Sequence, residues 1–241
     1  MTDRAARLKQ EAGELAAGLV ESGMVIGLGT GSTAIFATRR IAERLCAGEL
    51  QRIVAIATSS ATEAAARALG ISMLADDIPR NIDLIIDGAD EVDPDMGLIK
   101  GGGGALLREK IVAQATRREV IVVDESKLSP KLGTHYALPV EVLEFGWRSQ
   151  ARFLESLGVV VTLRVQGGER YHTDGGNMIL DSRFGAIADA PSLAAKLEAR
   201  AGIIAHGLFL GLVQDVIVAG AGCVRHVCRG ERMPMPMDPS R

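Results

Sequence analysis

The 241-residue chain is poor in aromatic residues, and neither sign of charge dominates it. Phe, Trp and Tyr together make up 3% of the residues, whereas hydrophobic residues make up 47%, so we expect a core of aliphatic side chains. The 27 basic and 30 acidic residues are interspersed and give a net charge of −3. This balance excludes a large positive field for nucleic acid or an anionic membrane surface, so any anionic ligand is expected to be small and locally held.

Cysteine is also scarce. Cys46, Cys223 and Cys228 are an odd number with no paired framework, which predicts no disulfides and favours a reducing cytoplasm. Cys223, His226 and Cys228 raise the question of a metal site, but the two cysteines are not spaced as CxxC and no second such cluster exists. We therefore assign these residues structural roles and expect no metal.

Long hydrophobic runs are lacking as well. No apolar stretch approaches the ~20 residues that span a bilayer, so we expect no membrane association. Near the N-terminus, Leu8, Ala12, Leu15 and Leu19 recur at helical spacing between charged residues, which predicts an amphipathic helix and not a signal peptide. At the other end, repeated prolines predict a flexible tail over residues 231–241.

What the chain does contain is an alternation of strand and helix patterns. Four short apolar runs predict buried parallel strands: "MVIGLG", "RIVAIAT", "IDLIID" and "EVIVVD". Helical patterns lie between them; the first two end at Gly48 and Gly70, and Ser59 or Ser60 is available as the N-cap of the second. Strand, helix and strand in this order predict an α/β fold: a parallel sheet with helices on both faces.

The pattern changes after about residue 132. Residues 133–205 are rich in strand patterns, with turn signals at "QGGE" and "TDGG" and two helical patterns, which predicts a smaller α+β domain. "DVIVAG" is again a core-type strand, so the chain is expected to return to the first sheet within residues 206–230. We therefore predict a first domain over residues 1–132, to which the chain later returns.

The loop "GLGTGSTA" (27–34) resembles a nucleotide-binding loop at first sight. A dinucleotide fingerprint needs G-x-G-x-x-G, but Ser32 stands where the third glycine should be, and no Walker lysine follows. Unpaired N–H groups at the start of a helix still favour an anion there, so the loop is a candidate site for one phosphate. Its residues are Thr30, Gly31, Ser32 and Thr33. A simple capped turn is an equally good interpretation of this segment alone.

Two further segments carry polar or glycine-rich patterns. "DGADEVD" (87–93) places Asp87 and Asp90 directly after a buried strand, where carboxylates can bind sugar hydroxyls; a polar turn is the alternative. "KGGGGALLREK" (100–110) contains four consecutive glycines, which permit close approach of the backbone to a ligand. A flexible linker is the alternative, but it would not normally run straight into a helix.

Together these motifs resemble one enzyme family. "GLGTGST", "DGADEVD", "KGGGGALLREK", "VVDESK", "LPVEV" and "TDGGNMILD" occur in the order and at the separations typical of ribose-5-phosphate isomerase of the A type. Lys100 lies thirteen residues after Asp87, and Glu109 lies twenty-two residues after Asp87. The resemblance extends from the first helix to about residue 220, and residues 206–230 are less typical.

The resemblance implies a Rossmann-like parallel-sheet domain with a second, smaller α+β domain. It also implies a homodimer or dimer of dimers that acts on a sugar phosphate without metal or organic cofactor. Glu109 matches the catalytic base, and Asp87, Asp90 and Lys100 match further catalytic residues. The implied substrate-binding residues are Thr30, Gly31, Ser32, Thr33, Asp87, Gly88, Ala89, Asp90, Lys100, Gly101, Gly102, Gly103 and Lys127.

The expected chemistry is an aldose–ketose isomerisation in the non-oxidative pentose phosphate pathway. One base, Glu109, moves a proton between C2 and C1 of ribose 5-phosphate, while Lys100 and glycine N–H groups stabilise the enediolate oxygen. Asp87 and Asp90 position hydroxyls and transfer protons. The competing hypotheses are a sugar-phosphate sensor, which would not need Glu109, a CoA transferase, which would use a glutamate as nucleophile, and an NAD dehydrogenase.

Overall fold

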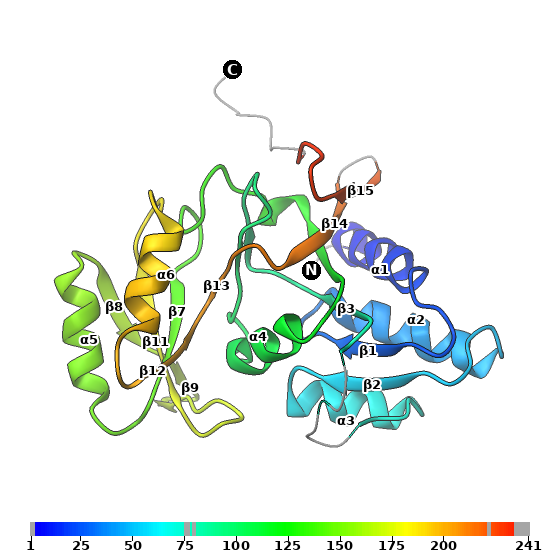
Figure 1. Ribbon diagram of the computed structural model, residues 1–241, viewed down its shortest axis with the longest axis horizontal. Coiled ribbons are helices and arrows are strands. Elements are labelled where there is room, and N and C mark those ends of the chain that lie inside the picture. Colours follow the sequence, from blue (N-terminus) through cyan, green and yellow to red (C-terminus); the bar gives the residue numbers. More distant parts are fainter. Residues whose placement is uncertain (1–2, 75–77, 79–80, 221–222, 234–241) are drawn as a thin grey trace. The chain divides into compact units, whose positions relative to one another are not determined.

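The computed structural model describes residues 3–74, 78, 81–220 and 223–233 (Figure 1). Residues 234–241, which form most of the predicted tail, lie outside the described residues. The chain forms two compact units: residues 1–89, 108–127 and 212–241 make up the first, and residues 90–107 and 128–211 the second. Residues 90–107 were predicted to lie in the first domain, but they belong to the second unit, where residues 98–99 pair with residues 208–209.

The first unit is built on a sheet with the strand order β15-β14-β6-β3-β1-β2 (Figure 1). The strands are β1 (Val25–Leu28), β2 (Val54–Ala57), β3 (Leu84–Asp87), β6 (Glu119–Asp124), β14 (Val213–Ala219) and β15 (Val224–Cys228). All neighbours are parallel except β15, which runs antiparallel to β14 at the edge. The parallel sheet is confirmed, and β14 returns to it beside β6; the edge strand β15 was not predicted.

One face of this sheet is covered by α1 (Asp3–Ala17), α2 (Ala34–Cys46) and α3 (Ser60–Ala68). Ala12 and Ala16 of α1 and Ile41 of α2 belong to one buried cluster with Ile26 and Ile86 of the strands. The predicted stripe on α1 is partly wrong, because Leu15 is 45% exposed. The buried face instead continues from Ala12 to Ala16, which lies four residues, or about one helical turn, further along the helix.

The other face is covered by α4 (Leu106–Gln114). Val112 of this helix packs in a cluster with Val25 and Ile85. Gly27 allows this close packing, since a Cβ there would lie 3.0 Å from Cγ1 of Val112 and 2.7 Å from Cγ1 of Ile85. The prediction of helices on both faces is therefore confirmed.

The second unit is the smaller α+β part of the fold. Its main sheet is antiparallel, with the order β12-β7-β11-β8, and a second, three-stranded sheet has the order β13-β5-β4. The strands are β4 (Glu91–Val92), β5 (Leu98–Ile99), β7 (Leu138–Val142), β8 (Val160–Leu163), β11 (Met178–Arg183), β12 (Ile203–His206) and β13 (Leu208–Phe209). The helices α5 (Trp147–Ser156) and α6 (Ala190–Glu198) pack on the main sheet through a shared core that includes Val140, Leu154 and Leu197.

The two turn signals of the sequence are found in this unit. Gly167 and Gly168, both at positive φ, connect the hairpin of β9 (Val165–Gln166) and β10 (Glu169–Arg170). In "TDGG", the N–H of Gly176 donates to the carbonyl of Thr173 at 2.8 Å. Within the part of the chain that the structure describes, no helix has both the length and the apolar character that crossing a membrane requires.

Candidate active site

The first predicted site segment lies where the strand order of the parallel sheet reverses. The chain passes from β1 to β2 on one side and then returns to β3 on the other side of β1. In open α/β sheets, ligands bind beyond the carboxyl ends of the strands at such a switch point. Thr30 follows the end of β1 and Asp87 ends β3, so the two residues flank this point.

Asp87 is fixed in place by the backbone of both loops. Its Oδ1 accepts hydrogen bonds from the N–H groups of Thr30, at 3.0 Å, and Gly88, at 2.7 Å, and its side chain is buried. Gly29 leaves the room for this carboxylate, because a Cβ at position 29 would lie 2.2 Å from Asp87 Oδ1. Position 29 therefore needs a glycine, because any side chain there would collide with the Asp87 carboxylate.

The Thr30 hydroxyl joins a cluster of hydroxyl groups that follows the end of β2. Its Oγ1 lies 2.8 Å from Thr58 Oγ1 and donates to Ser59 Oγ at 2.8 Å, and Thr62 Oγ1 is 3.1 Å away. Ser59 is also the N-cap of α3, because its side chain accepts from the Thr62 N–H. This settles the choice between Ser59 and Ser60. The cluster orients Thr30 from a neighbouring strand.

The rest of the predicted phosphate loop leads into α2. Gly31 and Ser32 are exposed, and Thr33 is the N-cap residue of the helix. The first turn of α2 holds no acidic residue, so nothing there opposes the positive end of the helix dipole. Lys9 of α1 adds a cation: its Nζ donates to Ser32 Oγ at 3.1 Å and lies 3.8 Å from a carboxylate oxygen of Asp124. These features favour an anion at the loop.

Glu109 lies in the first turn of α4 and its side chain is buried. The end of α4 meets the start of β3, where the Ile82 N–H donates to the carbonyl of Ala115 at 2.9 Å. The helix therefore runs antiparallel to the strand, and its first turn lies toward the carboxyl ends of the strands. In agreement, the neighbouring Arg108 donates to Ser60 Oγ, beyond the end of β2, at 3.3 Å.

Lys127 also follows the carboxyl end of a strand in this sheet. It ends the short 3₁₀ helix η1 (Glu125–Lys127), directly after β6, and is half-buried. Because β6 lies next to β3, Lys127 follows the strand adjacent to the one that Asp87 ends.

The second unit holds the other predicted residues. Asp90 precedes β4 and Lys100 follows β5, and pairing of these two strands brings both residues to the same end of the hairpin. The Asp90 N–H donates to the carbonyl of Ile99, at 2.8 Å. Lys100 is almost fully buried, with Nζ 5.6 Å from the centre of the Phe209 ring.

The glycine run is an ordered loop and not a flexible linker. The Gly102 N–H donates to Asp90 Oδ2 at 2.6 Å, and the guanidinium of Arg164 donates to the carbonyls of Gly101 and Gly102 at 2.8 and 3.2 Å. Gly102 and Gly103 remain exposed. The last glycine, Gly104, has a φ of +84°, and a Cβ there would lie 2.1 Å from the hydroxyl oxygen of Tyr171.

The structure therefore groups the predicted residues within each unit. Thr30, Asp87 and Gly88 are joined by hydrogen bonds in the first unit, where Ala89 is half-buried, and Asp90 and Gly102 are joined in the second. Sequence reasoning missed Lys9 and the hydroxyl groups near Thr30. The run "TSSAT" at the end of the second predicted strand carried a signal for these hydroxyls, whereas a single lysine in an amphipathic helix carried none.

These features define an α/β protein in which Asp87, the loop after β1 and the first turn of α4 lie toward the carboxyl edge of a parallel sheet, where small anionic ligands bind. The sequence profile of ribose 5-phosphate isomerase A (phosphoriboisomerase A) matches residues 54–222. The chain belongs to the ribose 5-phosphate isomerase A family.

Individual relatives match over nearly their whole length. The ribose-5-phosphate isomerase A of Chloroflexus aurantiacus is 57% identical over 220 residues, which are 91% of this chain and 92% of the relative. The ribose-5-phosphate isomerase A of Desulfatibacillum aliphaticivorans is 55% identical over 221 residues, which are 91% of this chain and 96% of the relative.

Solved structures agree in fold. The ribose 5-phosphate isomerase from Plasmodium falciparum superposes with a TM-score of 0.91 at 36% identity, covering 94% of this chain and 100% of that one. A D-ribose-5-phosphate isomerase in complex with phospho-erythronic acid gives a TM-score of 0.90 at 34% identity, and the match covers 92% of this chain and 98% of that one.

Proposed function

We propose that this protein interconverts D-ribose 5-phosphate and D-ribulose 5-phosphate through an enediolate. The observation that carries the proposal is a buried glutamate in the family's motif, on the first turn of a helix that points toward the loops after β1 and β3. An aldose–ketose isomerase needs one base that reaches two adjacent carbons, and a carboxylate held by a helix suits this role. Membership of the isomerase family supports the same reaction.

In the proposed mechanism, Glu109 removes the proton from C2 of the open-chain aldose and returns it to C1. Negative charge develops on the C1 oxygen while the proton is on Glu109. Lys100, a buried cation, and the N–H groups of Gly101 and Gly103 stabilise this charge, while the Gly102 N–H donates to Asp90. A cation in a desolvated site is effective because the low dielectric strengthens its field.

The remaining residues hold and prepare the substrate. Asp87 and Asp90 bind sugar hydroxyls and transfer protons, including the proton that moves when the furanose ring opens. The loop from Thr30 to Thr33 binds the phosphate at the start of α2, with Lys127 as a further contact. The position of Lys9 beside Ser32 supports a phosphate at this loop, since a second cation lowers the free energy of the bound dianion.

The proposal needs no metal or organic cofactor. A coupled assay with ribose 5-phosphate, a chelator and no added cofactor is therefore expected to give full activity. Phospho-erythronic acid is expected to inhibit competitively, because its carboxylate resembles the two oxygens of an enediolate. Activity that required a metal or NAD would overturn this proposal, and covalent labelling by acyl-CoA would favour a CoA transferase.

We further propose a cytoplasmic enzyme of the non-oxidative pentose phosphate pathway that forms a homodimer or a dimer of dimers. The odd number of cysteines, which have no paired framework, favours this compartment. In support of self-association, Phe145 is 93% exposed and its neighbour Leu143 is 43% exposed, and large exposed apolar side chains often mark contact surfaces. Light scattering during gel filtration measures the mass, and a monomer at micromolar concentration would contradict the proposed assembly.

A further inference from the structure

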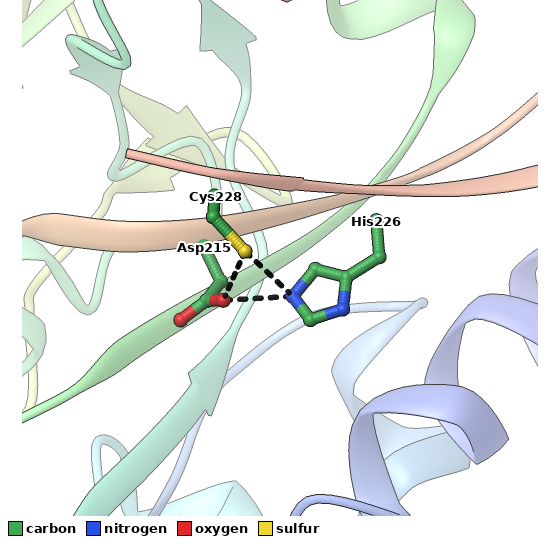
Figure 2. A group of neighbouring side chains, drawn as sticks. All are labelled: Asp215, His226 and Cys228. Carbon is green, nitrogen blue, oxygen red and sulfur yellow. Dashed lines mark hydrogen bonds and ion pairs between the residues drawn. The ribbon is translucent and has the colours of Figure 1, made fainter. Parts of the chain in front are cut away.

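The hairpin of β14 and β15 brings together three side chains with metal-binding atoms. Asp215 on β14 pairs directly with Cys228 on β15, and His226 lies two residues before Cys228. Side chains two residues apart on a strand point to the same side, so the hairpin gathers Asp215, His226 and Cys228 on one face (Figure 2). Among the described residues, this is the one group of three such side chains whose donor atoms converge.

The three donor atoms surround a common point. His226 Nε2 lies 2.7 Å from Asp215 Oδ1, Cys228 Sγ lies 3.5 Å from the same oxygen, and Sγ and Nε2 are 4.0 Å apart (Figure 2). A Cys-His-Asp catalytic relay would use two different ring nitrogens, one for the thiol and one for the carboxylate. Here the same Nε2 faces both partners, so the geometry fits convergence on one ion better than a relay.

The distances suit a tetrahedral zinc ion. Zn²⁺ binds cysteine sulfur at about 2.3 Å and histidine nitrogen and carboxylate oxygen at about 2.0–2.2 Å, so tetrahedral ligand atoms lie roughly 3.3–3.6 Å from one another. The three separations in the protein, from 2.7 to 4.0 Å, bracket this range. The Sγ–Oδ1 separation of 3.5 Å already lies within this range, and the 30% exposure of the His226 side chain leaves its ring room to rotate and change the two separations that involve Nε2.

The residues around the three side chains orient the Asp215 carboxylate and leave Cys228 accessible to a metal ion from solvent. Asp215 is buried, and the Nε of Arg118 donates to its Oδ2 at 2.7 Å while Nη2 donates to Oδ1 at 2.9 Å. A metal ion bound to Oδ1 would replace the hydrogen bond from Arg118 Nη2, while the hydrogen bond from Arg118 Nε to Oδ2 would remain. Glu231 adds a negative charge nearby, since its carboxylate accepts from the Cys228 N–H at 2.8 Å. Cys228 is exposed, so solvent supplies a fourth ligand.

We propose that Asp215, His226 and Cys228 form a zinc site that fastens the edge strand β15 to β14. From the sequence we expected no metal at Cys223, His226 and Cys228, because the cysteines are not spaced as CxxC and no second cluster exists. Strand pairing instead brings Asp215, which lies 11 residues before His226, beside Cys228. On binding, the thiol loses its proton to solvent, and the thiolate, the neutral imidazole and the carboxylate ligate the ion with a water molecule. The ion holds together two strands at the sheet edge, separately from the isomerase residues.

Titration of the metal-free, reduced protein with Co²⁺ tests the site. We expect one equivalent to bind with a thiolate-to-cobalt charge-transfer band, and Zn²⁺ to displace it. Zinc is also expected to raise the thermal midpoint of unfolding, because it binds only the folded hairpin. Isomerase activity is expected to be the same with zinc and with chelator, so the outcome is independent of the proposed catalytic function.

Four variants distinguish the proposed ligands from other residues. Cys228→Ser is expected to abolish the charge-transfer band, and His226→Gln to weaken cobalt binding more than about tenfold. Cys46→Ser and Cys223→Ser are matched controls that replace the other free cysteines, and they are expected to bind as the wild type does. Absence of the band in the wild-type protein would mean a hydrogen-bonded cluster only and would overturn the proposal, as would loss of the band in Cys223→Ser.

Discussion

The N–H of Thr30 and the carboxylate of Asp87 are joined by a hydrogen bond of 3.0 Å between two loops that are 57 residues apart in sequence. The bond spans the point where the strand order reverses, so it fixes the loop after β1 against the end of β3. A sugar phosphate bound here, as we propose, would meet the loop after β1 and a carboxylate whose relative position is set before binding. Such preorganisation removes part of the entropy that orienting a substrate costs.

Replacing Gly29 tests this relationship. Gly29→Ala places a Cβ 2.2 Å from the present position of Asp87 Oδ1, so the carboxylate must move. We expect kcat/KM for ribose 5-phosphate to fall roughly 100-fold, the loss typical of a catalytic group displaced by about 1 Å. Gly48→Ala is the control, because it strains a surface glycine at φ +75° and is expected to lower stability without this loss. Equal effects of both variants would contradict the assigned role of Gly29.

The hydroxyl cluster predicts separable effects on stability and binding. Ser59→Ala removes the N-cap of α3 and one partner of Thr30, so we expect a loss of about 1 kcal/mol in unfolding free energy and a higher KM. Thr58→Val removes another partner of Thr30 but no cap, and is expected to raise KM with a smaller loss of stability. Urea unfolding and steady-state kinetics measure the two effects. An unchanged KM in both variants would exclude the cluster from substrate binding.

Lys100 is expected to act mainly in the transition state. Lys100→Met keeps the aliphatic volume of this buried side chain but removes its charge. Because the charge on the enediolate develops only during the reaction, kcat is expected to fall about 10²- to 10³-fold with little change in KM. Lys196→Met, an exposed lysine on α6, is the control. A change confined to KM would make Lys100 a residue for ground-state binding.

The N-cap of α6 predicts a pH-dependent contribution to stability. Hydrogen bonds from the side chain and the backbone N–H of Ser192 lower the pKa of the Asp189 carboxyl from its ordinary value of 3.8. A lowered pKa in the folded state stabilises the protein above pH 3.8, and this contribution is lost as the pH falls through the lowered pKa. Asp189→Asn keeps a capping side chain that does not titrate. The difference in urea midpoint between wild type and variant is therefore expected to change below pH 3.8 and to stay constant above it.

The parts of the fold that the sequence predicted are those with local patterns. The run "EVIVVD" coincides with β6, and Gly48 and Gly70 follow the ends of their helices at positive φ. The strands β4 and β5, with two residues each, were not predicted because such short segments have no periodicity. Leu15 fits the spacing of the buried stripe but lies outside it, since small alanines let α1 pack closely on a different face.

The candidate site shows the same division. Motifs with fixed spacing indicated Asp87, Lys100 and Glu109, because each combines an unusual residue type with a strand end or a glycine run. No sequence pattern indicated Lys9 or Asp215. Lys9 contacts Ser32, 23 residues away, and Asp215 contacts His226, 11 residues away, and only the folded structure brings these pairs together. Contacts of this kind depend on strand order and helix packing, which the sequence pattern does not specify.

The central claim is that the carboxylate of Glu109 carries the proton between C2 and C1. Glu109→Gln keeps the size of the side chain but cannot accept the proton, and Glu43→Gln, on the exposed surface of α2, is the matched control. The measurement is kcat for conversion of ribose 5-phosphate to ribulose 5-phosphate by both variants, with folding verified by circular dichroism. We predict a fall of about 10²- to 10⁴-fold for Glu109→Gln alone. Near wild-type turnover by a folded Glu109→Gln enzyme would contradict the mechanism.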